Sequence, residues 1–243
     1  KIIARAKDLG MSPATLAANM IASSEEDMVA LGCRSPDHAP RVSQMIPEII
    51  AMIETLIEKN AAYATTSGDV YYRVRSKQDY GKLSNRKPDD MRAGTRDIVK
   101  GDKEDELDFA LWKHDLTPDA SWKSPWGQGR PGWHIECSAM VKALLGDSID
   151  IHGGGRDLVF PHHENEIAQS ESATEKPFAR YWLHCGLLTI DKQKMSKSLG
   201  NHITLKDFLK SYPAEVLRLA FLQHHYQSNI DFNKATFTTA HKR

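Results

Sequence analysis

The stretch Ser148-Ile149-Asp150-Ile151-His152-Gly153-Gly154-Gly155 is followed shortly by Phe160-Pro161-His162-His163-Glu164-Asn165-Glu166. The first five residues predict a short apolar strand, which runs into a glycine-rich turn. Pro161 suits the first position of a helix, and we expect this helix to continue to about Glu171. A strand, a glycine-rich turn and a helix in this order indicate an α/β fold, in which ligands bind at the carboxyl end of the strand.

Helices are expected upstream of this stretch. A helix is expected from Pro13, which fits the first helical position, to about Leu31, and Ser12 can cap its start. Isoleucine and leucine side chains recur on one helical face between about Arg41 and Lys59, which predicts a second helix.

The segment from Ala61 to about Trp126 differs in character from these helices. Asp69–Val74 and Phe109–Trp112 are strand candidates, and glycine, asparagine, aspartate and proline punctuate the remainder. We interpret this segment as an insertion. The expected organisation is a helical first part (residues 1–60), the insertion (61–126), a second part of the main domain (127–200) and a closing helical region (201–243).

The composition is ordinary for a soluble globular protein, with 40% apolar and 26% charged residues. Lys+Arg and Asp+Glu are both 32, so bulk charge gives no argument for nucleic-acid binding, which would have to use local patches. The three cysteines are few and widely spaced, which favours a reducing cytosol over a disulfide framework. No apolar run reaches membrane-spanning length, and no signal peptide is visible.

Three side chains are candidate metal ligands. Cys137 lies on a helix expected from Pro131 to Leu145, and His162 and Glu166, four residues apart, share a face of another helix. A thiolate, an imidazole and a carboxylate suit zinc. A buried cysteine beside an ion-pairing histidine and glutamate is the alternative, and spacing does not exclude His163 as the ligand. The hydrolytic zinc motif H-E-x-x-H is not met.

Two glycine runs are candidate nucleotide sites. Gly127–Gly132 matches G-x-G-x-x-G, but the preceding Ser121–Trp126 does not predict a strand, so we reject a dinucleotide site there. Gly153–Gly155 follow a predicted strand, and their bare backbone could approach an adenosine or ribose. A tight turn is the alternative interpretation.

Two further features point to small-molecule chemistry. Lys194-Met195-Ser196-Lys197-Ser198 places lysines beside small hydroxyl side chains, which suits a transient polyphosphate, although a solvated polar loop is the alternative. Trp133 could wall a small substrate pocket, and it could equally be part of the core.

Together these segments resemble the cysteinyl-tRNA synthetases, which are class I aminoacyl-tRNA synthetases. Lys194–Ser198 matches the second signature of that class letter for letter. Ser124–Met140 is similar to the family's segment around a zinc cysteine, and Asp150–Gln169 is similar to the segment with its zinc histidine and glutamate. Tyr80–Ser84 and Asp108–Lys113 resemble its connective insertion.

The resemblance implies part of a Rossmann-like class I synthetase catalytic domain with a connective-peptide insertion. It implies one zinc ion per chain, held by Cys137, His162 and Glu166, and it places Trp133 beside the bound cysteine. It implies that Lys197 contacts ATP, with Lys194 in support, and these two lysines are the expected catalytic residues. The glycine run after the predicted strand, Gly153, Gly154 and Gly155, is the further candidate for contact with the nucleotide.

The implied reaction is attack of the carboxylate of L-cysteine on the α-phosphate of ATP, with Mg²⁺, followed by transfer of cysteine to tRNA(Cys). The resemblance further implies a cytoplasmic enzyme, which we expect to be a monomer. Zinc would bind the substrate thiolate, for which the hydroxyl of serine is a poor substitute. Packing against a small side chain alone discriminates by only about 1–3 kcal/mol.

The sequence also departs from the family pattern. The first class I signature, H-x-G-H, and the family's fourth zinc ligand, a cysteine, belong upstream of Lys1, and the anticodon-binding domain belongs downstream of Arg243. We therefore expect an internal fragment that is a poor catalyst alone. Two alternatives remain: a related ligase that joins cysteine to an amino-sugar in thiol biosynthesis, and a non-catalytic zinc- or tRNA-binding fragment.

Overall fold

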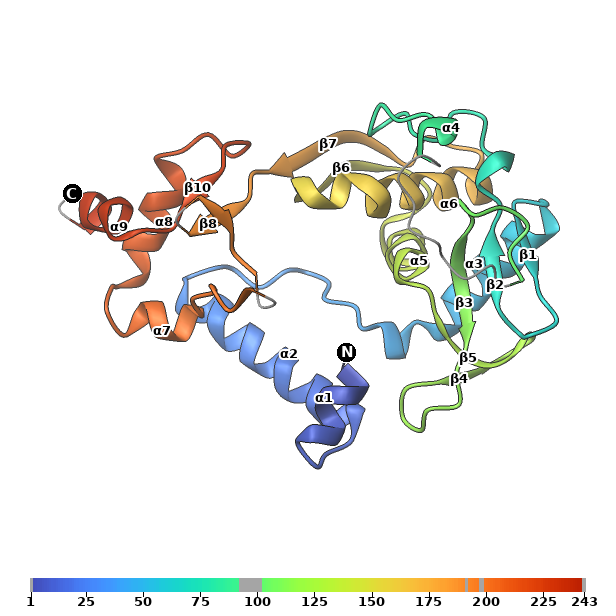
Figure 1. Ribbon diagram of the computed structural model, residues 1–243, viewed down its shortest axis with the longest axis horizontal. Coiled ribbons are helices and arrows are strands. Elements are labelled where there is room, and N and C mark those ends of the chain that lie inside the picture. The colour runs from blue at the N-terminus through green and yellow to red at the C-terminus, as the bar shows by residue number, and fades with distance from the viewer. Residues whose placement is uncertain (1, 92–101, 191, 197–198, 242–243) are drawn as a thin grey trace. The chain divides into compact units, whose positions relative to one another are not determined.

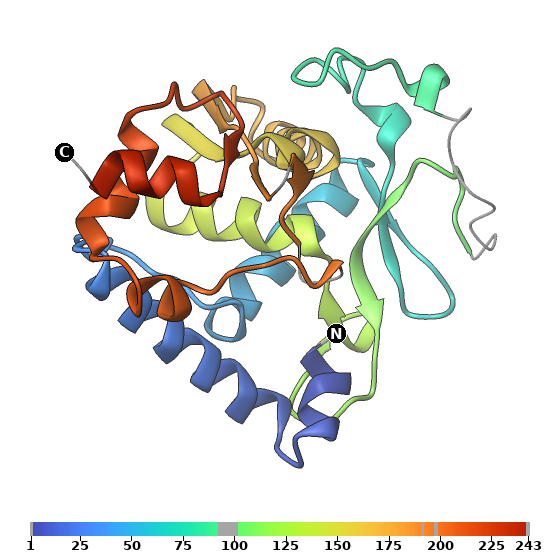
Figure 2. The same cartoon turned by 60° about the vertical axis from the view of Figure 1, so that its left-hand side comes forward.

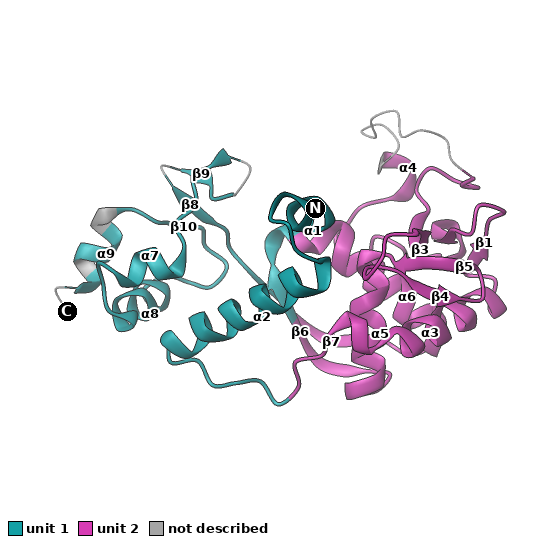
Figure 3. Cartoon of the chain, turned by 90° about the horizontal axis from the view of Figure 1, so that it is seen from below, with its two compact units in different colours: residues 1–37, 153–157, 183–243 teal, residues 38–152, 158–182 magenta. Residues whose placement is uncertain are grey.

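The structure is a computed structural model that describes residues 2–91, 102–190, 192–196 and 199–241. The chain forms two compact units (Figure 3). The larger unit contains His38–His152 and Leu158–Trp182, and the smaller unit contains Lys1–Asp37, Gly153–Asp157 and Leu183–Arg243. The division into segments 1–60, 61–126, 127–200 and 201–243 stays a prediction.

The larger unit combines helices with a five-stranded sheet (Figure 1). Its helices are α3 (Ile46–Glu58), α4 (Pro88–Met91), α5 (Trp133–Leu145) and α6 (Glu164–Thr174). Its strands are β1 (Ala62–Ala64), β2 (Val70–Tyr72), β3 (Phe109–His114), β4 (Trp122–Ser124) and β5 (Gly127–Pro131). The strand order is β1-β2-β3-β5-β4, and each neighbouring pair is antiparallel.

Helix α3 begins later than expected, at Ile46 instead of Arg41. Pro47 is the reason, because a proline ring inside a helix clashes with the carbonyl four residues earlier and donates no hydrogen bond. Residues Val42–Gln44 form a separate turn of 3₁₀-helix. The expected apolar face of α3 is confirmed, since its buried side chains are Ile46, Ile49, Met52, Ile53 and Leu56.

Helices α3, α5 and α6 pack against one another, and α5 also packs against β3 (Figures 1 and 2). The core between these elements includes Leu111 and Trp112 of β3, which are both fully buried. Burial of each such large side chain contributes about 1.5–3 kcal/mol. The two predicted strands are confirmed with other bounds: β2 covers only Val70–Tyr72 of the expected Asp69–Val74, and β3 extends past Trp112 to His114. Strand β3 packs against α5, the helix that carries Cys137.

The segment Ser121–Trp126 was not expected to form a strand, and this expectation is wrong. Trp122–Ser124 forms β4 and pairs with β5, so the G-x-G-x-x-G match lies in the second strand of a hairpin. Backbone groups of such a strand are used in the sheet ladder and are not free to cradle a phosphate. The rejection of a dinucleotide site at Gly127–Gly132 agrees with this geometry.

Strands β6 (Ile149–Gly155) and β7 (Ala179–Cys185) form a two-stranded sheet and lead the chain from one unit into the other. The predicted glycine-rich turn is wrong, because Gly153–Gly155 belong to β6 itself and none of them has a positive φ. The helix after it opens near Pro161, as expected: Phe160 is non-helical (φ −137°, ψ 133°), a π-helical turn that ends at His163 follows, and α6 (Glu164–Thr174) continues it directly.

The smaller unit combines helices with a three-stranded sheet of order β10-β8-β9. Its helices are α1 (Ile2–Asp8), α2 (Pro13–Ala30), α7 (Leu205–Leu209), α8 (Ala214–Leu222) and α9 (Lys234–His241), and its strands are β8 (Leu188–Ile190), β9 (Gln193–Lys194) and β10 (Ile230–Asp231). The predicted cap of α2 is confirmed, since Thr15 N donates to Ser12 Oγ at 3.1 Å. No helix within the described ranges is long and apolar enough to cross a membrane.

Candidate functional site

Cys137 is positioned by α5, which starts directly after β5. The helix begins at Trp133, because Pro131 is still paired with Trp112 in the sheet. Gly132 makes this abrupt change of direction possible: a Cβ at this position would lie 1.9 Å from the carbonyl oxygen of Ala110. One turn further along, Cys137 is half-buried.

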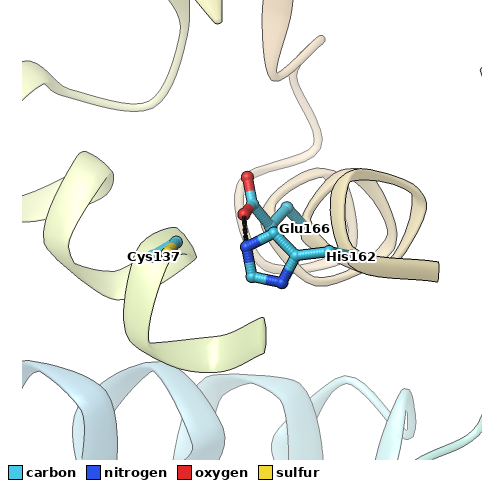
Figure 4. A group of neighbouring side chains, drawn as sticks. All are labelled: Cys137, His162 and Glu166. Carbon is cyan, nitrogen blue, oxygen red and sulfur yellow. Dashed lines mark ion pairs between the residues drawn. The ribbon is translucent and has the colours of Figure 1, made fainter. Parts of the chain in front are cut away.

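His162 lies in the helical turn that leads directly into α6, and Glu166 lies in the first turn of α6. Both are buried, with 5% and 1% of their surface exposed. The expectation that residues four apart share a face is confirmed, because His162 Nε2 lies 2.6 Å from Glu166 Oε1 (Figure 4). The other oxygen of Glu166, Oε2, lies 2.7 Å from Nε2 of His152, a residue of β6.

The structure brings Cys137, His162 and Glu166 together. One donor atom from each of the three lies within 4.8 Å of the other two (Figure 4). A buried contact between the two helices supports this arrangement: Gln169 Nε2 of α6 donates to Ser138 Oγ of α5 at 2.7 Å. The sequence did not show that Cys137 approaches the other two residues, because this depends on how α5 packs on α6.

A second group of possible ligands shares Glu166. Donor atoms of His152, His163 and Glu166 also lie within 4.8 Å of one another. Spacing left His162 and His163 as rivals, and the structure places them in different groups, with His162 in the group that contains Cys137.

The pKa values of Glu166 and Cys137 depend on the balance between burial and the charged or hydrogen-bonding groups nearby. Burial alone would raise the pKa of Glu166, but the imidazoles of His152 and His162 outweigh it and hold this pKa at about 2. Burial, reinforced by the Glu166 and Glu136 carboxylates, raises the pKa of the Cys137 thiol to about 12. The carboxylate is therefore ionised at neutral pH, whereas the thiol keeps its proton until a cation is nearby.

Two histidines close to the group were not singled out from the sequence. His134 Nδ1 lies 2.9 Å from His162 Nδ1, and burial, followed by the proximity of His162, lowers the pKa of His134 to about 4. His152 contacts Glu166 as described above. The available signals were the position of His134 beside Trp133 and the position of His152 at the end of a predicted strand.

Trp133 lies beside the donor atoms and is largely exposed. Its ring stacks on the His162 ring with the centroids 4.4 Å apart, while 58% of its surface is exposed. The alternative that Trp133 is plain core is therefore wrong. Its free face is a place where a small molecule held at the donor atoms would find an aromatic wall.

The remaining predicted site residues belong to the smaller unit. Gly153–Gly155 form the last part of β6, and a Cβ at Gly155 would lie 2.6 Å from Asp157 Oδ1. Lys194 is the last residue of β9, and its Nζ forms an exposed ion pair with Asp157 Oδ2 at 2.8 Å. Lys197 and Ser198 lie outside the described residues.

The turn before the lysine segment is held by Asp231 of β10. Its Oδ1 accepts hydrogen bonds from Thr189 Oγ1 at 2.9 Å and from Lys192 N at 3.0 Å. After the turn, Asn201 Oδ1 accepts from Ser196 N at 2.9 Å. Side chains outside the segment therefore fix the described part of Lys194–Ser198.

A comparison with known protein families shows to which family the chain belongs. Over residues 1–242 the chain matches the family described as "tRNA synthetases class I (C) catalytic domain". The chain belongs to this family.

Individual members of the family are close relatives. The chain is 54% identical over 232 residues to the cysteine–tRNA ligase of Chromohalobacter salexigens, which is 96% of the chain and 50% of that protein. It is 56% identical over 232 residues to the cysteine–tRNA ligase of Oleidesulfovibrio alaskensis, again 96% of the chain and 48% of the relative. The chain thus spans about half the length of the curated relatives that it matches.

A solved structure of a class I synthetase shares the fold. Mycobacterium tuberculosis methionyl-tRNA synthetase, in complex with methionyl-adenylate, superposes with a TM-score of 0.70 at 14% identity, over 98% of the chain and 57% of that structure's chain. The predicted α/β fold, as part of a Rossmann-like class I synthetase catalytic domain, is confirmed. The resemblance to cysteinyl-tRNA synthetases is confirmed by the relatives.

Proposed function

We propose that this chain is the part of a cysteine–tRNA ligase that holds and activates L-cysteine. The observation that carries the proposal is the gathering of Cys137, His162 and Glu166 beside the exposed face of Trp133. The relatives at 54% and 56% identity, both named cysteine–tRNA ligase, support the same activity.

The donor set fits one zinc ion. Donor atoms bound to one tetrahedral zinc lie about 3–4 Å from one another, given zinc–ligand distances of about 2.0–2.3 Å. The three donors of this chain, which lie within 4.8 Å, need only a small closure to meet that geometry. A buried thiolate is costly without a cation, and the bound metal would stabilise this form of Cys137. When bound, zinc would supply a coordination position for the thiolate of the substrate.

Each group of candidate site residues then has a separate role in the activation of cysteine. Cys137, His162 and Glu166 hold the ion, and the exposed Trp133 ring packs against the small substrate. Lys194 and Lys197 stabilise charge on the phosphates of ATP, with Mg²⁺, while the carboxylate of cysteine attacks the α-phosphate. The glycine run Gly153, Gly154 and Gly155 has a further role, because its bare backbone approaches the adenosine or ribose.

The proposal extends to partners and location. Activated cysteine passes to tRNA(Cys), and the enzyme acts as a monomer in the cytoplasm. The names of the relatives favour tRNA over an amino-sugar as the acceptor. The segments 1–60, 61–126, 127–200 and 201–243 correspond in this proposal to catalytic, insertion, catalytic and closing helical parts.

Spectroscopy of the cobalt-substituted chain tests thiol recognition directly. With Co²⁺ in place of zinc, addition of L-cysteine is expected to strengthen the sulfur-to-cobalt charge-transfer absorption, because a second thiolate joins that of Cys137. L-Serine at the same concentration is expected to leave the spectrum unchanged. Identical responses to cysteine and serine would show that the metal does not select the substrate thiol.

A further inference from the structure

Two buried polar residues lie between the candidate ligands and are not ligands themselves. Glu164 and Asn165 form the first turn of α6, between His162 and Glu166, and only 1% and 2% of their surfaces are exposed. A buried carboxylate or amide is costly unless it is hydrogen-bonded, so the partners of these side chains carry structural information.

Both partners come from one turn of the insertion, Tyr80–Ser84. Glu164 accepts two backbone hydrogen bonds, from Leu83 N to Oε1 at 3.4 Å and from Ser84 N to Oε2 at 2.8 Å. Asn165 Oδ1 accepts from the hydroxyl of Tyr80 at 2.5 Å. These contacts join residues 80 or more positions apart in the chain.

The turn Tyr80–Ser84 has a fixed shape. Gly81 has φ +98°, and a Cβ there would lie 1.7 Å from the carbonyl oxygen of Arg86. Arg86 N in turn donates to Gly81 O at 3.1 Å. The guanidinium of Arg86, two residues after the turn, lies 4.5 Å from the centre of the Phe160 ring. The chain that leaves the turn therefore also contacts the segment that enters α6.

Helix α6 depends on such outside support at its first turn. Phe160 is non-helical, so the helical path that enters α6 begins only at Pro161 and is one short turn long. His163, at the helix start, provides no side-chain cap for the first backbone N–H groups. A small rotation of this turn would move His162 and Glu166 together relative to Cys137, which lies on α5.

We infer that Glu164 and Asn165 are positioning residues for the proposed metal site, through which the turn Tyr80–Ser84 holds the start of α6 in the orientation that presents His162 and Glu166 to Cys137. The inference rests on the proposed metal site. It gives the insertion a role in the site beyond packing: its turn sets the distance that the metal ligands must span.

A matched pair of tyrosine substitutions tests this inference. Tyr80→Phe removes the hydroxyl that binds Asn165, next to Glu166. Tyr72→Phe removes the hydroxyl of another buried tyrosine, which binds the same helix further along, at Ala168 O (3.1 Å) and Ser172 Oγ (2.8 Å). Both variants keep the aromatic ring and lose hydrogen bonding to α6, one contact for Tyr80→Phe and two for Tyr72→Phe, so a purely structural role predicts at least as large an effect for Tyr72→Phe.

The measurement is Co²⁺ affinity and the ligand-field spectrum of the 243-residue chain, with thermal unfolding of each apo variant alongside. We expect Tyr80→Phe and Glu164→Gln to weaken Co²⁺ binding by about tenfold or more, the usual effect of losing an orienting partner of a ligand. Tyr72→Phe is expected to change Co²⁺ affinity by less than about twofold even if its unfolding temperature falls equally.

Equal Co²⁺ affinity in Tyr80→Phe and Tyr72→Phe, whether both unchanged or both reduced, would overturn the inference while leaving the metal site in place. Failure of the unaltered chain to bind Co²⁺ at all would instead remove the proposed metal site, and this inference with it. The two failures are therefore distinguished by the unaltered chain.

Discussion

Replacement of Cys137 by serine is expected to weaken zinc binding by at least about 100-fold. Loss of an orienting partner alone costs about 10–100-fold in metal affinity, and loss of a ligand should cost at least as much. A serine hydroxyl is a harder and much less acidic donor than a thiol, so it is a poor replacement beside His162 and Glu166. The measurement is competitive titration of the purified chain with a zinc chelator of known affinity.

The other two cysteines supply the control. Cys33 and Cys185 are exposed free thiols and belong to neither group of possible ligands within the described residues. Cys33→Ser and Cys185→Ser should bind zinc as the unaltered chain does. Unchanged zinc affinity in Cys137→Ser would refute the ligand assignment. His162→Ala beside His163→Ala decides between the two rival imidazoles, and we expect the larger loss for His162→Ala.

Replacement of Gly132 by alanine is expected to destabilise the larger unit by more than about 3 kcal/mol, which is among the larger effects of a single substitution. The new Cβ would lie 1.9 Å from Ala110 O and 2.8 Å from the Ala110 carbonyl carbon, and both neighbours are backbone atoms. Gly132 N also donates to Leu111 O at 2.8 Å, so the clash cannot be relieved without breaking this bond. Urea unfolding of the chain measures the loss.

The opposite end of α5 provides the comparison. Gly146 has φ +95°, but nothing lies within 4 Å of a Cβ placed there. Gly146→Ala should therefore cost only the strain of a backbone conformation that is essentially restricted to glycine (φ +95°, ψ −171°), about 1–3 kcal/mol. Because Gly132 precedes Trp133 and Cys137, Gly132→Ala should also weaken zinc binding, whereas Gly146→Ala should not. Equal loss of stability in the two variants would contradict the close approach at Gly132.

The local elements were largely predictable where one residue or one periodicity decides them. Ser12 and Pro13 start α2, and the isoleucine face of α3 is buried as expected. The errors lie where neighbours in space decide. Trp122–Ser124 forms a strand only because β5 pairs with it, and Gly153–Gly155 stay extended in β6 although their sequence suits a turn.

The segment Tyr181–Ile190, whose residues on their own indicate a single strand, shows the same limit. It is two strands, β7 and β8, which belong to different sheets. Gly186 separates them, because its N–H donates to Tyr226 O at 2.8 Å and a Cβ there would lie 2.1 Å from Ser228 O. No property of residues 181–190 alone reveals a neighbour some forty positions further along the chain.

The candidate site divides in the same way. The pairing of His162 with Glu166 follows from the spacing of four, since an α-helical backbone places such residues on one face whatever surrounds it. The approach of Cys137, the contact of His152 with Glu166 and the hold of Tyr80–Ser84 on Glu164 each join distant segments. Those contacts come from the packing of α5, β6 and the turn Tyr80–Ser84 around α6, because only burial of their shared apolar surface brings these segments within reach of one another.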